Sequence, residues 1–331
     1  MNRNIIQTKQ VIKTYKRYKK EAGLRGSITG LWKRRYEEKA AVKDFSISIK
    51  EGEFVGLIGP NGAGKTTLIK MLTGIIAPDK GEIEVLGFYP NDMKNEFKKQ
   101  YAVVMGQKSQ LFFELTVNDT LRLFKEIYEI PEKEYKENKA YFTELFEVGE
   151  LMNVQVRTLS LGERMKMELM VALLHNPKIL FLDEPTIGLD AIASKQIRRF
   201  LKAVNKEKKT TIILTSHYME DIKALCERSI VINHGVKIYD GKTKELFEKY
   251  QVSKKITVTF EKPVKEMKMD TLNVSYLEDH AFQKILYVPK EGINELLAHI
   301  MAYEPNDISI EEEEVGVVVE RIYKEGSDSI V

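Results

Sequence analysis

The sequence predicts an α/β domain built on a mainly parallel sheet, and three short apolar runs are the main observation. Residues 53–58, 178–182 and 210–215 are apolar stretches of strand length, as expected for strands that are buried on both faces. A glycine-rich loop and a stretch with helical spacing follow the first run, and another helical stretch near 194–204 separates the other two. Strands that alternate with helices favour a parallel sheet covered on both faces.

The N-terminal part predicts two strands separated by a basic insertion. Residues 4–15 and 45–49 alternate between apolar and polar side chains, as half-buried strands do. Between them, residues 16–39 carry nine Lys or Arg residues against three Glu residues, together with several glycines. This stretch indicates an insertion.

The middle of the chain predicts a helix after the glycine-rich loop and then a helical subdomain. The first helix covers 65–73 and ends at Gly74, because glycine commonly terminates helices. Residues 101–176 are rich in helical spacing. Leu121, Phe124, Ile127 and Tyr128 fall on one face of an expected helix there.

A hairpin over 229–240 and a helix over 243–250 close the first predicted domain, residues 1–250. The chain has 331 residues, which exceeds the size at which one hydrophobic core stops growing. Residues 251–331 are therefore expected to form a small α+β domain. Its strands are predicted at 256–260, 284–288 and 307–310, and its helices at 291–301 and 315–323.

Composition bounds the class of protein. The apolar runs are far shorter than the roughly 20 residues of a membrane-spanning helix. The first residues show no secretory signal, and Cys226 is the single cysteine, which excludes an internal disulfide and favours a reducing compartment. We expect an ordinary globular protein from a 43% hydrophobic and 31% charged composition.

The glycine-rich loop matches the phosphate-binding pattern G-x-x-x-x-G-K-[ST] between a predicted strand and a predicted helix. Its phosphate-binding residues are Gly59, Pro60, Asn61, Gly62, Ala63, Gly64, Lys65 and Thr66, followed by Thr67. Backbone N–H groups of such a loop and the helix N-terminus point at phosphate oxygens. Lys65 is expected to reach the β- and γ-phosphates, and the Thr66 hydroxyl to coordinate Mg²⁺.

Two carboxylates end the apolar run at 178–182. Asp183 is positioned to hold Mg²⁺, and Glu184 to polarise the attacking water. Without other motifs, an Asp-Glu pair at the end of a strand is about as often a solvated strand end as a catalytic site. The phosphate-binding loop upstream favours the catalytic interpretation.

Residues 159–164, Leu-Ser-Leu-Gly-Glu-Arg, resemble the LSGGQ signature of ATP-binding-cassette (ABC) ATPases. Ser160 and Glu163 also form an S-x-x-E capping box, which predicts the start of a helix that runs through Leu174. The resemblance implies that Ser160 and Gly162 contact the γ-phosphate of ATP bound by a partner subunit. Leu161 and Glu163 depart from the usual pattern.

Three further positions resemble ABC motifs in the family's order. Gln107 matches the Q-loop glutamine, which touches Mg²⁺ or water, residues 187–190 match the D-loop, and His217 matches the switch histidine that bonds the γ-phosphate. An aromatic side chain near the first strand stacks on adenine in this family. Tyr15 and Tyr36 both satisfy that position, and Tyr15 is preferred.

The resemblance extends over residues 4–250 and is strongest with the ATPase subunits of type 2 exporters, while the C-terminal domain is similar in position to the accessory domain of the daunorubicin-resistance group. It implies the P-loop ABC ATPase fold, a mainly parallel sheet with an antiparallel β subdomain and a helical subdomain. It also implies ATP and Mg²⁺ as ligands, hydrolysis with Glu184, His217 and Gln107 as catalytic residues, and a homodimer or paired subunit that sandwiches two ATP molecules. The expected partner is a separate membrane permease, with the chain on the cytoplasmic face of the cell membrane.

Other interpretations remain at this point. A non-transport ABC ATPase acting on ribosomes or nucleic acid is one, although such relatives usually carry two cassettes or a long insertion. A passive nucleotide-binding scaffold is another, and Lys65, Asp183 and Glu184 weigh against it.

The basic insertion at 16–39 also allows two interpretations. It is either a solvated, partly helical surface loop, or an element that lies against lipid headgroups or the channel. Direct nucleic-acid binding is not expected, since residues 251–331 are acidic, with nine Lys or Arg against 16 Asp or Glu.

Overall fold

The computed structural model describes residues 3–18, 36–105, 109–216, 219–264, 267, 274–313, 318, 320–322 and 324. The chain forms two compact units, Met1–Thr243 and Lys244–Val331. The first unit therefore ends at the first residue of the helix that the sequence analysis placed at the end of the first domain.

A six-stranded sheet forms the centre of the first unit, with the strand order β5-β6-β7-β3-β8-β9. Its strands are β3 (Phe54–Ile58), β5 (Tyr101–Met105), β6 (Ile179–Asp183), β7 (Thr211–Thr215), β8 (Arg228–Asn233) and β9 (Val236–Lys242). All neighbours pair in parallel except β8 and β9, which form the expected hairpin. Every residue of β3 and β7 is buried, which confirms that the apolar runs are strands covered on both faces.

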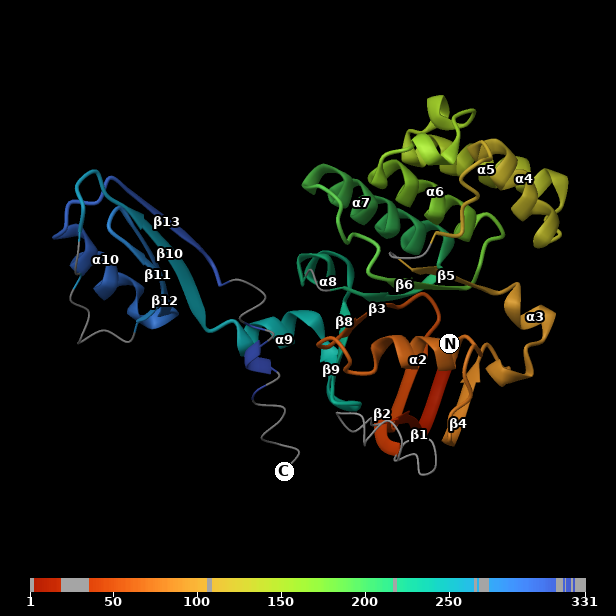
Figure 1. Cartoon of the computed structure of the whole chain (residues 1–331), viewed down its shortest axis with the longest axis horizontal. Coiled ribbons are helices and arrows are strands. Elements are labelled where there is room, and N and C mark those ends of the chain that lie inside the picture. Colours follow the sequence, from red (N-terminus) through yellow and green to blue (C-terminus); the bar gives the residue numbers. More distant parts are fainter. Residues whose placement is uncertain are drawn as a thin grey trace, which may run out of the picture. The chain divides into compact units, whose positions relative to one another are not determined.

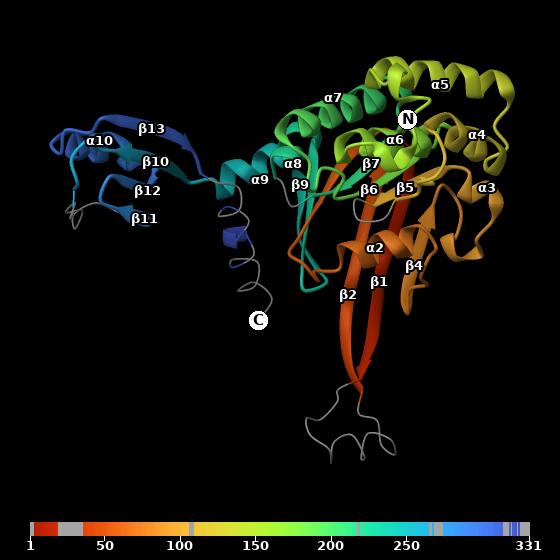
Figure 2. The ribbon, with the colours of Figure 1, turned by 45° about the horizontal axis from the view of Figure 1, so that its top comes forward.

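A separate antiparallel sheet has the order β2-β1-β4 and contains β1 (Asn4–Tyr18), β2 (Tyr36–Lys50) and β4 (Lys80–Val85). Figure 2 shows β1 and β2 as a long pair that extends away from the six-stranded sheet. Both strands are longer than predicted, so part of the stretch assigned to the basic insertion is strand. Charged cross-strand pairs such as Lys16 opposite Glu38 obscure the apolar alternation there. The remainder of the insertion, residues 19–35, lies outside the described part of the chain, so the structure does not decide between its two interpretations.

The helices of the first unit lie on either side of the six-stranded sheet. They are α2 (Lys65–Leu72), α3 (Asn95–Lys98), α4 (Val117–Ile127), α5 (Glu132–Phe146), α6 (Leu161–Leu173), α7 (Ala191–Lys208) and α8 (Met219–Leu225), with 3-10 turns at Pro90–Asp92, Gly149–Leu151 and Val156–Thr158. Figure 1 shows α4, α5, α6 and α7 gathered on one side, and α2 on the other side with β1, β2 and β4. One apolar cluster joins α2 to both sheets, with Val11, Phe45, Leu57 and Leu68 among its buried members.

Two details of the predicted helical subdomain differ from the structure. Residues 101–105 form β5 and pair with β6 in the central sheet, so the helical part begins after them. On α4, Leu121 and Phe124 are buried as expected, but Ile127, the last residue of the helix, is 55% exposed.

The second unit contains an antiparallel sheet with the order β11-β12-β10-β13. Its elements are β10 (Ser253–Thr259), β11 (Ser275–His280), β12 (Gln283–Pro289), β13 (Asp307–Glu312) and α10 (Ile293–Met301), with a 3-10 turn at Lys290–Gly292. Helix α9 (Thr243–Tyr250) precedes them. Alternate residues of β10 and β12 pack on Leu296 and Ile300 of α10, and β11 is a strand that the sequence analysis did not predict. No helix within the described residues of either unit has the length and apolar character needed to cross a membrane.

Candidate functional site

The glycine-rich loop connects the end of β3 to the start of α2, as the motif predicts. Gly64 has φ +112°, and a Cβ atom on it would lie 2.3 Å from the carbonyl oxygen of Ala41 in β2. A Cβ on Gly59 would lie 2.5 Å from the carbonyl oxygen of Ile232. Glycine is therefore required at both positions, because the backbone of the loop passes directly against two neighbouring strands.

The turn between β8 and β9 holds this loop from the other side. The N–H of Gly235 donates to the carbonyl of Ala63 at 2.9 Å, and the N–H of Lys43 in β2 donates to the carbonyl of Gly235 at 2.8 Å. The loop is thus fixed by backbone bonds that involve both sheets. Its other side is open, since Asn61 and Gly62 are exposed and a Cβ on Gly62 would meet nothing within 4 Å.

Lys65 is 6% exposed, and its ammonium group turns back into the loop. It donates to the carbonyl oxygens of Gly59 at 2.6 Å and Pro60 at 3.2 Å. Burial lowers the pKa of Lys65, while the carboxylates of Glu184 and Asp183 act in the opposite direction. A cation is therefore held beside two carboxylates at the mouth of the loop.

Asp183 is the last residue of β6, and its carboxylate connects three elements. Oδ1 accepts a hydrogen bond from Thr215 Oγ1 at 2.6 Å, and Oδ2 accepts from Thr66 Oγ1 at 3.4 Å. The side chain of Thr66 is otherwise exposed, while that of Thr67 next to it is half-buried. The structure thus brings together Lys65, Thr66 and Asp183. The sequence analysis missed Thr215, which has no spacing relation to Asp183 and meets it only because β6 and β7 are adjacent.

Glu184 follows the strand in an unusual backbone conformation. Its φ is +57°, in the left-handed region that residues other than glycine rarely adopt. Its N–H donates to the carbonyl of Thr215 at 3.0 Å, which fixes Glu184 at the end of β7 as well as β6. Left-handed residues of this kind cluster at functional sites, where the surrounding structure holds the strain.

The capping box predicted at Ser160 is confirmed. Ser160 is the N-cap of α6, and its Oγ accepts from the N–H of Glu163 at 3.3 Å. The Glu163 carboxylate accepts in return from the N–H and the Oγ–H of Ser160, both at 2.8 Å. These bonds lower the pKa of Glu163, so the first turn of α6 begins with a carboxylate on its cap.

The start of α6 also lies against the start of α7. A Cβ on Gly162 would come within 3.0 Å of Ala193 Cβ, and one on Gly188 within 3.2 Å of Leu161. Asp190 caps α7 by accepting from the N–H of Ala193 at 2.7 Å. The signature segment and the segment that matches the D-loop are therefore packed on each other.

Three of the predicted site side chains are not among those that the structure describes. Gln107 and His217 fall outside the described residues, as does the side chain of Tyr36. Tyr15 is 42% exposed on β1 and pairs with Lys39, two residues from the Ala41 that touches the loop.

Near the Q-loop position, the structure shows a contact that the sequence did not indicate. Glu168 of α6 is buried and accepts hydrogen bonds from the Ser109 hydroxyl and from the N–H of Gln110 at 2.9 Å. Burial raises the pKa of Glu168, and these hydrogen bonds oppose that rise. The segment after the Q-loop is thereby tied to the signature helix.

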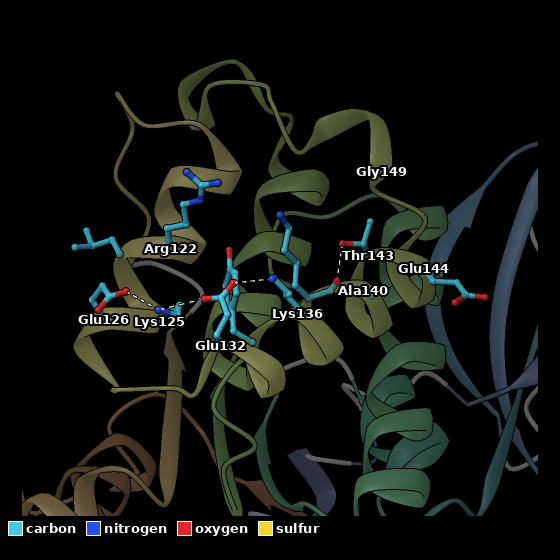
Figure 3. Close-up of a pocket in the computed structure, with 12 residues that line it drawn as sticks. Arg122, Lys125, Glu126, Glu132, Lys136, Ala140, Thr143, Glu144 and Gly149 are labelled. Atoms are coloured by element: carbon cyan, nitrogen blue, oxygen red, sulfur yellow. Dashed lines mark hydrogen bonds and ion pairs between the residues drawn. The ribbon is translucent and has the colours of Figure 1, made fainter.

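A hollow of about 1100 Å³ lies between α4 and α5, away from the phosphate-binding loop. In Figure 3, Lys125 bridges Glu126 and Glu132, and Lys136 also bonds to Glu132. These charges neutralise one another at the rim. The chemistry of the candidate site is at the loop and not in this hollow.

Comparison with known proteins gives a consistent result. A family model described as "ABC transporter" matches residues 42–187. The chain is 36% identical over 219 residues to the ABC transporter ATP-binding protein NatA of Bacillus subtilis (strain 168), covering 65% of this chain and 89% of that protein. It is also 36% identical to Nod factor export ATP-binding protein I of Rhizobium sp. (strain N33), covering 66% and 71%. The linearmycin resistance ATP-binding protein LnrL of Bacillus subtilis (strain 168) is 35% identical, covering 65% and 68%.

Solved structures show the same fold. An ATP-binding subunit of an ABC transporter superposes with a TM-score of 0.60 and 25% identity, covering 74% of this chain and 93% of that one. A dimeric ATP-binding cassette in a post-hydrolysis state with ADP and Pi gives 0.58 and 26% identity, covering 72% and 98%.

Proposed function

This chain belongs to the ABC transporter family as an ATP-binding subunit, and we propose that it hydrolyses ATP to drive an exporter whose channel is a separate membrane protein. The observation that carries the proposal is the convergence of Lys65, Thr66, Asp183 and Glu184 where β3 and β6 end. A cation, a hydroxyl and two carboxylates at the ends of parallel strands are the groups that phosphoryl transfer to water requires.

The loop is built to receive a triphosphate. Its backbone is held in place by Ala41 and Gly235, while Asn61 and Gly62 remain exposed. The first N–H groups of α2 have no partners inside the helix and attract anions together with the helix dipole. We assign phosphate binding to residues 59–67, and adenine stacking to Tyr15, whose exposed side chain lies on β1, the strand paired with the β2 strand that contacts the loop.

The residues present fit a magnesium ion. The hydroxyl of Thr66 and the carboxylate of Asp183 face one another at 3.4 Å, and Mg²⁺ takes oxygen ligands, commonly one or two carboxylates together with water and phosphate oxygens. Thr66 and Asp183 would hold the ion, with Gln107 as the third predicted ligand. Bound there, it would neutralise charge on the phosphate oxygens.

Hydrolysis is assigned to Glu184 as the residue that orients and polarises water. Its backbone N–H bonds to the carbonyl of Thr215, which fixes its position at the end of the strands. It directly follows Asp183, the residue that would hold magnesium. Lys65, once released from the carbonyls of Gly59 and Pro60, supplies positive charge to the β- and γ-phosphates. We assign His217 to hydrogen bonding with the γ-phosphate.

Each complete site requires a second subunit. This chain contains one phosphate-binding loop and one signature segment. We propose that Ser160 and Gly162 at the start of α6 cover the nucleotide held by a partner, in a dimer that contains two ATP molecules. A dimeric relative bound to ADP and Pi supports this arrangement.

The names of two relatives support a role in export across the membrane. One of them is named for Nod factor export and another for linearmycin resistance. We propose that this chain likewise drives export, bound to a permease on the cytoplasmic face of the membrane. ATP-dependent closing and hydrolysis-dependent opening of the dimer would move the helical subdomain and, through it, the permease.

The test is the isosteric replacement Glu184→Gln, measured as phosphate release from MgATP together with ATP binding. We expect hydrolysis to fall by a factor of about 100 or more, with ATP binding retained and a stable ATP-bound dimer detected by light scattering. Glu150→Gln, on the surface of the helical part, is the matched control and should hydrolyse ATP normally. Turnover of the Glu184→Gln protein at the normal rate would refute the assignment.

A further inference from the structure

We propose that the buried carboxylate of Asp221, through its hydrogen bond from Thr186, is the positioning device for Glu184. The inference rests on the role proposed above for Glu184. Thr186 lies two residues after Glu184, and Asp221 lies in α8, so the two meet only in the folded chain.

Asp221 is 1% exposed, and three donors from three separate segments share its carboxylate. Oδ2 accepts from the hydroxyls of Thr186 and Ser216, the latter at 3.1 Å, and Oδ1 accepts from Arg198 Nη1 at 2.6 Å. Hydrogen bonds to an ionised acceptor are about twice as strong as bonds between neutral groups, so this is a rigid connection.

The three donors come from segments that surround the hydrolytic centre. Thr186 belongs to the turn after β6, Ser216 follows β7, and Arg198 lies in α7, the helix that Asp190 caps. Asp221 therefore fixes the turn after Glu184 relative to the end of β7 and to α7.

Glu184 requires such support because its backbone is unfavourable. At φ +57°, a non-glycine residue remains in the left-handed region only where its neighbours enforce it. Upstream, the bond from Thr215 to Asp183 fixes the preceding residue. Downstream, the bond from Thr186 to Asp221 fixes the turn, so Glu184 is held between two anchored residues.

This arrangement predicts a specific kinetic effect. A displacement of about 1 Å in a catalytic group can lower the rate about 100-fold. Phosphate binding, in contrast, is assigned to the loop at 59–67, of which Thr186 is not a part. Loss of the Thr186 hydroxyl should therefore lower kcat and leave KM for MgATP nearly unchanged.

The experiment compares Thr186→Val, which removes the hydroxyl at almost constant shape, with Thr186→Ser, which keeps it. We expect kcat to fall about tenfold or more in Thr186→Val, KM to change by less than about twofold, and Thr186→Ser to recover most of the rate. Thr120→Val is the matched control, because Thr120 is a buried threonine on α4 whose hydroxyl bonds to the carbonyl of Thr116. Its kcat should stay at the wild-type value.

A second measurement separates positioning from general destabilisation. In a Glu184→Gln background, Thr186→Val should cause no further loss of the residual turnover, since both changes act through the same carboxylate. Thr186→Ala gives the same prediction if valine prevents folding. The inference is overturned if Thr186→Val retains its kcat, if Thr186→Ser loses as much, or if the losses multiply in the Glu184→Gln background. Retained hydrolysis in Glu184→Gln itself would instead overturn the proposed function.

Discussion

Protonation of His175 should destabilise the first unit at mildly acidic pH. The imidazole stacks on Tyr128, with 3.9 Å between ring centroids and 4° between the planes. Nε2 lies 3.4 Å from the carbonyl oxygen of Tyr101, and Nδ1 is a buried atom without a hydrogen-bond partner in the part of the chain that the structure describes. Burial lowers the pKa of His175 from 6.5 to about 4, and the Tyr101 carbonyl opposes that fall only in part.

The magnitude follows from these two pKa values. The unfolded chain binds a proton near pH 6.5, whereas the folded chain resists it until about pH 4. The contribution of His175 is therefore complete above pH 6.5 and decreases as the pH falls toward 4. At 1.36 kcal/mol for each pH unit, folding loses about 2 kcal/mol at pH 5 relative to pH 7 from this residue alone.

His175→Phe is the variant that isolates this effect, because a phenyl ring can keep the stack on Tyr128 and cannot be protonated. Urea unfolding of the full chain, followed by circular dichroism at pH 7 and pH 5, measures the free energy in both proteins. Every other titratable group is present in both proteins, so its contribution cancels in the difference between their unfolding free energies. The wild type should lose about 2 kcal/mol more than the variant between the two pH values. Equal losses would refute the reasoning.

Three further changes test the loop and the signature segment. Lys65→Met should reduce phosphate release about 100-fold or more by removing the cation that we propose to bind the γ-phosphate, with the folded state checked by circular dichroism. Gly64→Ala places a Cβ 2.3 Å from the carbonyl oxygen of Ala41 and should lower stability by about 2 kcal/mol or more in thermal unfolding, whereas Gly62→Ala has open space and should cost about 1 kcal/mol. Glu163→Gln should remove a stabilisation that the wild type retains above about pH 4.5 and loses as the pH falls through the lowered pKa; identical acid unfolding of the two proteins would contradict this.

Much of the fold could be predicted because its signals are local in sequence. Continuous apolar runs mark strands buried on both faces, and β3 and β7 are indeed buried throughout. The capping box of Ser160 and Glu163 was readable because its two residues are three positions apart and bond to one another.

The missed features depend on contacts between distant segments. Thr186 and Asp221 are 35 positions apart, and Thr215 and Asp183 are 32 apart, so no spacing rule connects them. Residues 101–105 were assigned to the helical part because a five-residue edge strand carries too short a pattern to distinguish from helix. The extension of β1 and β2 was missed since charged pairs replace apolar alternation.

The two hydrogen bonds of Lys65 to the carbonyls of Gly59 and Pro60 have a consequence for how a nucleotide enters. These two carbonyl oxygens accept from the buried ammonium group, so its charge is not left without polar partners. Under the proposed function, a triphosphate that binds this loop therefore competes with the two backbone oxygens for the N–H donors of Lys65. Binding is an exchange of acceptors around one cation, and the energy gained is the difference between phosphate and carbonyl as its partner.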